Sequence, residues 1–292
     1  MKTHSIYKTE NGRKITLQQY ESYLSRFSTR FDRVAVETRF GKPHTLVGGP
    51  ADGKPLFLFQ RGNCIQPMTL SWFSSLLDEF RIYAPDTIGH PGYSDERRIS
   101  AQDDSFAWWA SDLMDHFGVK ESACAGASYG AGILLRLAAS QPNRIRCAVL
   151  VSPAGITVGP KWNMIKQVLV PLLRFKCTGS DRALQQITDA LSCGKMSPED
   201  RAIIGDIFRH VRLERNMPKL AQPAELASYN APTMLAVGQR DIFFPGDAVI
   251  QAAQDLFPHL VVSRFDEMGH FPTAEWMPKI QQEIREFLHR HA

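Results

Sequence analysis

The fold is decided by the stretch Cys124-Ala125-Gly126-Ala127-Ser128-Tyr129-Gly130-Ala131-Gly132. It follows an apolar run and precedes a second one with helical spacing, so we predict a strand ending near Ala125 and a helix beginning near Ser128. Between them lies Gly-x-Ser-x-Gly, a pattern typical of a nucleophilic serine on a sharp strand-to-helix turn. A Cβ at either flanking glycine would collide with the neighbouring strand or helix. The pattern alone also fits a closely packed turn without chemistry, so the rest of the chain must decide.

Length and composition are typical of a globular protein with a sizeable core. The chain has 292 residues, of which 43% are hydrophobic and 22% charged. Its net charge of +4 is spread without a basic block, so nucleic acid is not an expected partner. No apolar run has the length of a membrane span and residues 1–14 are polar, so we expect a cytoplasmic protein with no membrane partner. Five cysteines without a close pair suggest neither a disulfide framework nor a zinc site.

Strands and helices alternate through most of the chain. Residues 55–59 form a continuous apolar run, which indicates a strand covered on both faces. Further strands are predicted at 81–85, 146–151, 231–238 and 260–265, with helices at 69–80, 105–117, 246–257 and 278–290. A helix over 15–27 and a hairpin of 33–39 with 44–47 precede them. This order predicts an α/β fold with a mostly parallel central sheet and helices on both faces.

One long segment interrupts this alternation. Residues 155–227 contain helical patterns at 174–191 and 198–211 and no convincing strand. We therefore predict a core formed by residues 1–154 and 228–292, with a helical cap, 155–227, inserted in it. Parallel sheets bind ligands outside the carboxyl ends of their strands. The cap would leave and rejoin the core at that edge, and so would cover the site.

Two further residues lie where a nucleophilic serine would need partners. A serine hydroxyl requires a base, and the base requires a group that fixes its tautomer. Asp241 follows the strand at 231–238, and His270 follows the last strand. The chain order Ser128, Asp241, His270 is the nucleophile, acid, base order associated with this type of turn.

With these residues in this order, the sequence resembles the α/β-hydrolase superfamily over about residues 38–289. Four short motifs carry the resemblance: Gly126-Ala127-Ser128-Tyr129-Gly130, Gly238-Gln239-Arg240-Asp241, Met268-Gly269-His270-Phe271 and the loop Asp86-Thr87-Ile88-Gly89-His90-Pro91-Gly92-Tyr93-Ser94. The esterase-like members with a cap after the sixth strand look closest. The resemblance implies an α/β-hydrolase fold and a metal-free serine hydrolase without a cofactor. It makes Ser128 the nucleophile, His270 the general base and Asp241 the residue that orients the base.

The segment after the third strand departs from the family pattern. Many members carry His-Gly there, followed by the residue whose backbone N–H completes the oxyanion hole. Here the pair is Arg61-Gly62, which leaves Asn63 and Tyr129 as the two expected backbone donors. Since only its N–H is proposed to act, we expect the Asn63 side chain to matter little. We expect Arg61 to face solvent and His90 to lie exposed in its loop.

The expected activity is hydrolysis of carboxylic esters or related small to medium acyl compounds. Thioesters, lactones, amides and carbon–carbon bonds remain open as substrates of the same residues, and so does a non-catalytic ligand-binding protein on this fold. The expected partner is a small-molecule acyl substrate. Aromatic residues flank the predicted site, which favours an uncharged acyl group. These residues are Trp72, Phe73, Phe243, Phe244 and Phe271.

Overall fold

An eight-stranded sheet runs through the protein in the order β1-β2-β4-β3-β5-β6-β7-β8. The structure, a computed structural model, describes residues 5–292. The strands are β1 (Asp32–Ala35), β2 (His44–Gly48), β3 (Lys54–Phe59), β4 (Phe80–Pro85), β5 (Ser122–Ala127), β6 (Ile145–Val151), β7 (Thr233–Gly238) and β8 (Leu260–Phe265). β2 pairs antiparallel with β1 and β4, whereas all pairs from β4 through β8 are parallel. The sheet is therefore mostly parallel, as predicted.

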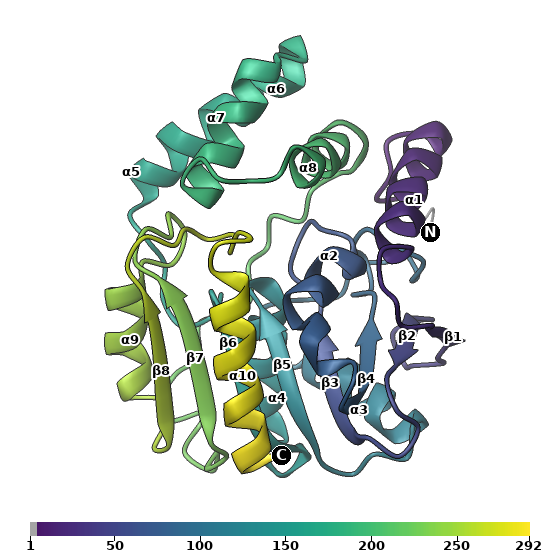
Figure 1. Ribbon diagram of the computed structural model, residues 1–292, viewed down its shortest axis with the longest axis vertical. Helices are drawn as coiled ribbons and strands as arrows, with labels where there is room; N and C mark the ends of the chain where they lie inside the picture. The colour runs from purple at the N-terminus through teal and green to yellow at the C-terminus, as the bar shows by residue number, and fades with distance from the viewer. Residues whose placement is uncertain (1–4) are drawn as a thin grey trace.

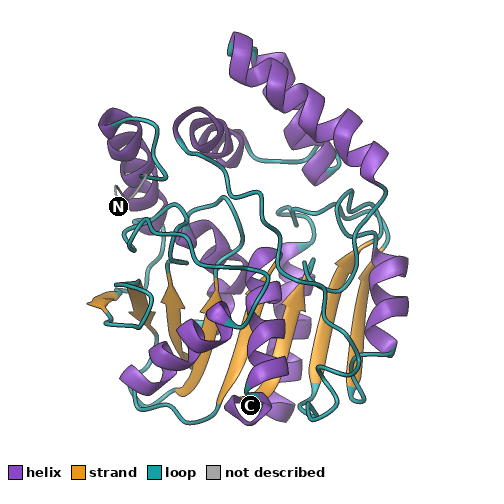
Figure 2. Cartoon of the chain, turned by 180° about the vertical axis from the view of Figure 1, so that it is seen from behind, coloured by secondary structure: helices purple, strands orange, loops and turns teal. Residues whose placement is uncertain are grey.

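Helices cover both faces of this sheet (Figure 1, Figure 2). They are α1 (Glu10–Leu24), α2 (Gln66–Leu70), α3 (Ser105–His116), α4 (Tyr129–Ser140), α5 (Lys161–Met164), α6 (Val170–Thr178), α7 (Asp181–Ser192), α8 (Pro198–His210), α9 (Gly246–Gln254) and α10 (Met277–His291), with 3₁₀ turns η1 (Ser71–Leu76) and η2 (Pro142–Arg144) and a π turn η3 (Ile165–Leu169). Strand β3 shows how the layers form, because its side chains alternate. Leu56 and Leu58 join the core that holds η1 and α10, while Phe57 and Phe59 join the core that holds α3, α4 and α9.

Several helices differ in extent from the sequence expectation. The pattern at 174–191 is divided between α6 and α7, because Gly179 ends α6 in a left-handed conformation and the Ser180 side chain caps α7. The helix expected over 69–80 is instead the short α2 followed by the 3₁₀ turn η1. The Ser71 hydroxyl donates to the Met68 carbonyl, a local bond that competes with continued α-helix. Helix α1 begins at Glu10, before the expected start, because the Thr9 side chain caps it by accepting from the Gly12 N–H.

A layer of helices lies beyond the carboxyl ends of the strands (Figure 1). It contains α5 to α8, which connect β6 to β7. The N-terminal helix α1 lies beside α8, where the Tyr23 hydroxyl bonds to the Asp200 carboxylate at 3.2 Å and Tyr7 pairs with Val211 as an isolated β-bridge. The sequence did not predict that α1 belongs to this layer. The division into a core and a cap over 155–227 stays a prediction.

No helix within residues 5–292 is both long enough and apolar enough to cross a lipid bilayer.

Candidate active site

The turn between β5 and α4 places Ser128 at a strained backbone position. Ser128 has φ +50° and ψ −115° and precedes Tyr129, the first residue of α4. A Cβ on Gly126 would lie 2.5 Å from the Gly130 carbonyl oxygen, and one on Gly130 would lie 2.1 Å from the Phe59 carbonyl oxygen. Both distances are far below van der Waals contact with main-chain atoms that cannot move aside. The steric role expected for the two glycines is confirmed.

Ser128, His270 and Asp241 form one hydrogen-bonded line. The His270 Nε2 lies 3.1 Å from the Ser128 Oγ, and the His270 Nδ1 lies 2.8 Å from the Asp241 Oδ2. The second carboxylate oxygen, Oδ1, accepts from the backbone N–H groups of Phe243 and Phe244 at 2.8 and 3.0 Å. Because Asp241 is buried and both oxygens are engaged, its orientation is fixed. A neutral His270 with its proton on Nδ1 leaves Nε2 free to accept the serine proton.

Hydrophobic contacts hold His270 from the side. The Phe243 ring meets the imidazole edge to face, with centroids 4.9 Å apart, and the Phe244 ring lies at 5.5 Å. Both rings follow Asp241 on the same loop, so one loop supplies the carboxylate and the two rings that contact the imidazole. The aromatic flank expected from the sequence is therefore present for these two residues.

The two predicted oxyanion donors come from adjoining segments. Tyr129 opens α4, so its backbone N–H has no acceptor within the helix. Asn63 has φ +50°, and its N–H makes only a long bond of 3.4 Å to the His90 Nδ1. A Cβ on Gly62 would lie 3.0 Å from the Tyr129 Cβ, which shows how closely this loop lies against the start of α4. Their catalytic role stays a prediction.

His90 is buried, so the expectation of an exposed loop residue is wrong. Its ring packs against Tyr129, with centroids 4.7 Å apart. Burial, with a smaller contribution from the positive charge of Arg98, lowers the pKa of His90 to about 3. His90 is therefore a neutral acceptor beside the Asn63 N–H over the ordinary pH range.

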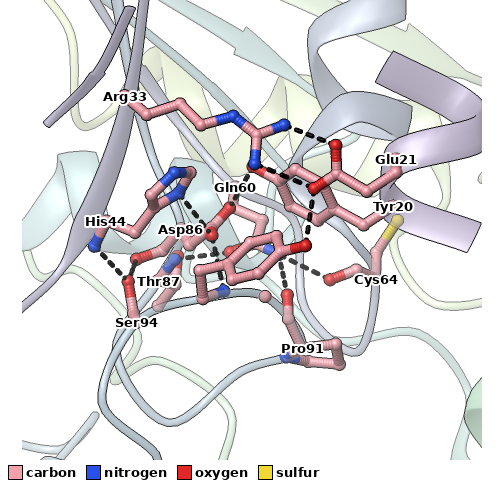
Figure 3. A network of polar contacts seen from close by, with 12 residues as sticks. Tyr20, Glu21, Arg33, His44, Gln60, Cys64, Asp86, Thr87, Pro91 and Ser94 are labelled. Atoms are coloured by element: carbon pink, nitrogen blue, oxygen red, sulfur yellow. Dashed lines mark hydrogen bonds and ion pairs between the residues drawn. The ribbon is translucent and has the colours of Figure 1, made fainter. Parts of the chain in front are cut away.

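Gln60, the residue after β3, joins the loops at this edge of the sheet (Figure 3). Its side-chain amide donates to the carbonyls of Cys64 and Pro91, and its oxygen accepts from the Thr87 N–H. The loop that carries Asn63 is thus tied to the loop that follows β4. Sequence reasoning missed this residue, although a fully polar side chain at the end of a buried strand was the available signal.

Asp86, the residue after β4, connects that loop to α1. Its carboxylate accepts from the Tyr93 N–H at 2.8 Å, a bond within its own loop. It also accepts from the Tyr20 hydroxyl of α1 at 2.9 Å and lies 3.0 Å from the His44 Nδ1 (Figure 3). Helix α1 is therefore anchored to the edge of the sheet where the candidate site lies.

Arg61 is buried at 5% exposure, so the expectation that it faces solvent is wrong. Its guanidinium carbon lies 4.2 Å from the ring centroids of both Trp72 and Phe271. The two rings are themselves 5.3 Å apart and nearly perpendicular. A planar, weakly hydrated guanidinium is well suited to aromatic faces, which explains how this cation remains inside.

Comparisons with known proteins agree with this architecture. A family described as alpha/beta hydrolase fold matches residues 55–196. The chain is 25% identical over 278 residues to carboxylesterase YbfK of Bacillus subtilis (strain 168), covering 93% of this chain and 92% of that protein. The crystal structure of carboxylesterase CesB (YbfK) from Bacillus subtilis superposes with a TM-score of 0.79 at 23% identity, over 95% of this chain and 98% of the other.

A second solved structure is similar over nearly the whole chain. Naproxen esterase (carboxylesterase NP) from Bacillus subtilis has a TM-score of 0.82 at 19% identity, covering 96% of this chain and 99% of that one. At these identities the solved structures establish the fold. Together with the family model matched over residues 55–196 and the strand order, they give one conclusion: the chain has the α/β-hydrolase fold.

Proposed function

We propose that this protein is a serine hydrolase that cleaves carboxylic esters through an acyl-enzyme on Ser128. The observation that carries the proposal is the hydrogen-bonded line from Ser128 through His270 to Asp241, at 3.1 and 2.8 Å. A base within hydrogen-bond reach of a strained, helix-capping serine is the arrangement that nucleophilic catalysis requires. The similarity to carboxylesterase YbfK over 93% of the chain supports the choice of esters.

Acylation begins when the Ser128 Oγ attacks the acyl carbon and His270 Nε2 takes its proton. Asp241 keeps the other ring nitrogen protonated and stabilises the imidazolium that forms. The acyl oxygen becomes an oxyanion, which the backbone N–H groups of Tyr129 and Asn63 stabilise. The Asn63 N–H would exchange its long bond to His90 for the stronger, charge-assisted bond to this oxygen.

Acylation is complete when the imidazolium of His270 protonates the leaving alcohol, which departs and leaves Ser128 acylated. Deacylation repeats the same proton path with water as the nucleophile. His270 then takes a proton from water as the water attacks the acyl carbon, and it returns that proton to the Ser128 Oγ.

Burst kinetics test the proposal. With p-nitrophenyl butyrate in excess, we expect one equivalent of p-nitrophenolate per active site before slower steady turnover, or steady turnover alone if acylation limits the rate. The Ser128→Ala variant should give neither. A correctly folded wild-type protein without turnover of any activated ester would favour the rival, a ligand-binding protein on this fold.

A further inference from the structure

Arg61 forms no ion pair with a carboxylate among residues 5–292, and its hydrogen bonds and ring contacts are with uncharged groups. Its Nη2 donates to the Cys64 Sγ at 3.2 Å, and a thiol sulfur is a weak acceptor. Its Nε is enclosed and has no hydrogen-bond partner among the described residues. Nη1 has no such partner either, and it is not among the enclosed atoms, so it is the one guanidinium nitrogen within the described residues that is free to donate.

A second buried arginine shows what this chain provides when the charge is structural. Arg136 is also 5% exposed, and its guanidinium pairs with Asp104 at 2.7 Å and with Glu225 at 3.1 Å. Buried charges are costly unless they are paired, and Arg136 follows that rule with two partners. Within residues 5–292 Arg61 contacts two aromatic faces and pairs with no carboxylate, so its free N–H group is available to an anion from outside the chain.

Arg61 adjoins both the loop of Asn63 and the loop of His270. It lies two residues before Asn63, so the two Cα atoms are at most about 8 Å apart. The Phe271 ring against its guanidinium belongs to the residue that follows His270. The guanidinium thus lies between the loop of the predicted oxyanion donor and the loop of the predicted base.

We propose that Arg61 binds a carboxylate carried by the substrate of Ser128. The aromatic rings hold the guanidinium in place, and its free Nη1 can donate a charge-assisted N–H bond to a carboxylate. The proposal rests on the proposed ester hydrolysis and names its substrate class as esters that bear a second, anionic carboxyl group. It differs from the uncharged acyl group expected from the sequence, an expectation that rested on the aromatic residues flanking the predicted site.

The test compares ester pairs that differ only in charge. Monoethyl succinate, glutarate and adipate are each paired with the ester in which carboxamide replaces the free carboxylate. A second set places the group on the alcohol side, with 3-butyryloxypropanoate against 3-butyryloxypropanamide. We expect at least a 10-fold higher kcat/KM for the carboxylate in at least one pair, as a charge-assisted hydrogen bond predicts.

Variants of Arg61 then assign the preference. Arg61→Met keeps an unbranched stem between the rings and should bring the carboxylate-to-amide ratio close to one, whereas Arg61→Lys should restore part of it. Arg146→Met removes an exposed arginine at the start of β6, at the opposite edge of the sheet, and should leave the ratio unchanged.

The outcomes separate this inference from the proposed function. Equal hydrolysis of both members of every pair by the wild type overturns the role of Arg61 and leaves ester hydrolysis intact. A preference that persists in Arg61→Met also overturns it. Should Arg61→Met fail to fold, inhibition of the wild type decides the matter, because glutarate must then inhibit more strongly than glutaramide. No hydrolysis of any ester by the folded wild type would instead count against the proposed function.

Discussion

The side chain of Asn63 holds the main chain of Glu214 through two hydrogen bonds. The Asn63 Oδ1 accepts from the Glu214 N–H at 2.7 Å, and the Asn63 Nδ2 donates to the Glu214 carbonyl at 3.0 Å. Glu214 lies in the segment that returns from α8 to β7, and its carboxylate pairs with Arg98 at 3.1 Å. The loop of a predicted oxyanion donor is therefore fastened to the segment that leaves the helical layer above the sheet.

This contact changes what we expect of Asn63 variants. Asn63→Gly keeps a residue suited to φ +50° but loses both bonds to Glu214, so the N–H donor should lose its fixed position. We expect kcat to fall about 10-fold or more, since small misplacements at a reacting centre are costly, with a smaller change in KM. Asn63→Ala should lose about 1 kcal/mol more of unfolding free energy than Asn63→Gly, because alanine is strained at positive φ. Steady-state kinetics within two-fold of wild type for Asn63→Gly would mean that the side chain does not position the donor.

Asp241→Asn tests the orientation of the base. The amide oxygen of Asn can still accept from the Phe243 and Phe244 N–H groups, so the loop should keep its structure. The amide disfavours the tautomer of His270 that accepts the serine proton. We expect kcat to fall by about 10⁴, the loss that the same substitution causes in a serine protease triad. Activity within a few-fold of wild type would point to another carboxylate. Asp266 would be examined next, although it is paired with Arg264 here.

Gly130→Ala tests the close approach that the turn requires. The new Cβ would lie 2.1 Å from the Phe59 carbonyl oxygen, so either β3 or α4 must shift. We expect the unfolding free energy to drop by about 3 kcal/mol or more. Gly118→Ala is the matched control, since it has φ +67° with nothing within 4 Å of its Cβ, and only backbone strain of about 1 kcal/mol is expected. Equal urea midpoints for the two variants would contradict the packing account.

His90 predicts a specific loss of stability in acid. Its pKa is about 3 in the folded protein, below the ordinary value of 6.5, so the unfolded chain binds the proton more readily below pH 6.5. Its contribution to unfolding free energy is therefore lost as the pH falls from about 6.5 towards 3, by about 2 kcal/mol at pH 5. His90→Asn should lose correspondingly less between pH 7 and pH 5 in urea unfolding. The same pH dependence in both proteins would show that His90 is not held neutral.

The sequence predicted the structure well where steric contacts or chain order permit only a few residue types at a position. Gly126 and Gly130 are required by main-chain atoms within 2.6 Å, and such a requirement leaves a readable pattern. The buried strands were equally readable, because runs such as residues 55–59 must be apolar on both faces.

Contacts between distant segments could not be predicted in the same way. The amphipathic pattern of α1 identifies an apolar face but not its partner, which is α8. Asn63 and Glu214 are 151 residues apart, and neither residue type marks the other. Arg61 looked like a solvated cation because arginine is mostly exposed, and the two rings that bury it come from Trp72 and from Phe271, at the far end of the chain.

The most direct measurement of the central claim is covalent labelling of Ser128. The intact mass of the wild-type protein treated with a fluorophosphonate should rise by one adduct, and peptide mapping should place it on Ser128. The Ser128→Ala variant should fold normally, because the hydroxyl adds little packing, and should remain unlabelled under the same conditions. Labelling of Ser128→Ala to the same extent, or an adduct on another residue of the wild type, would contradict the assignment of Ser128 as the nucleophile.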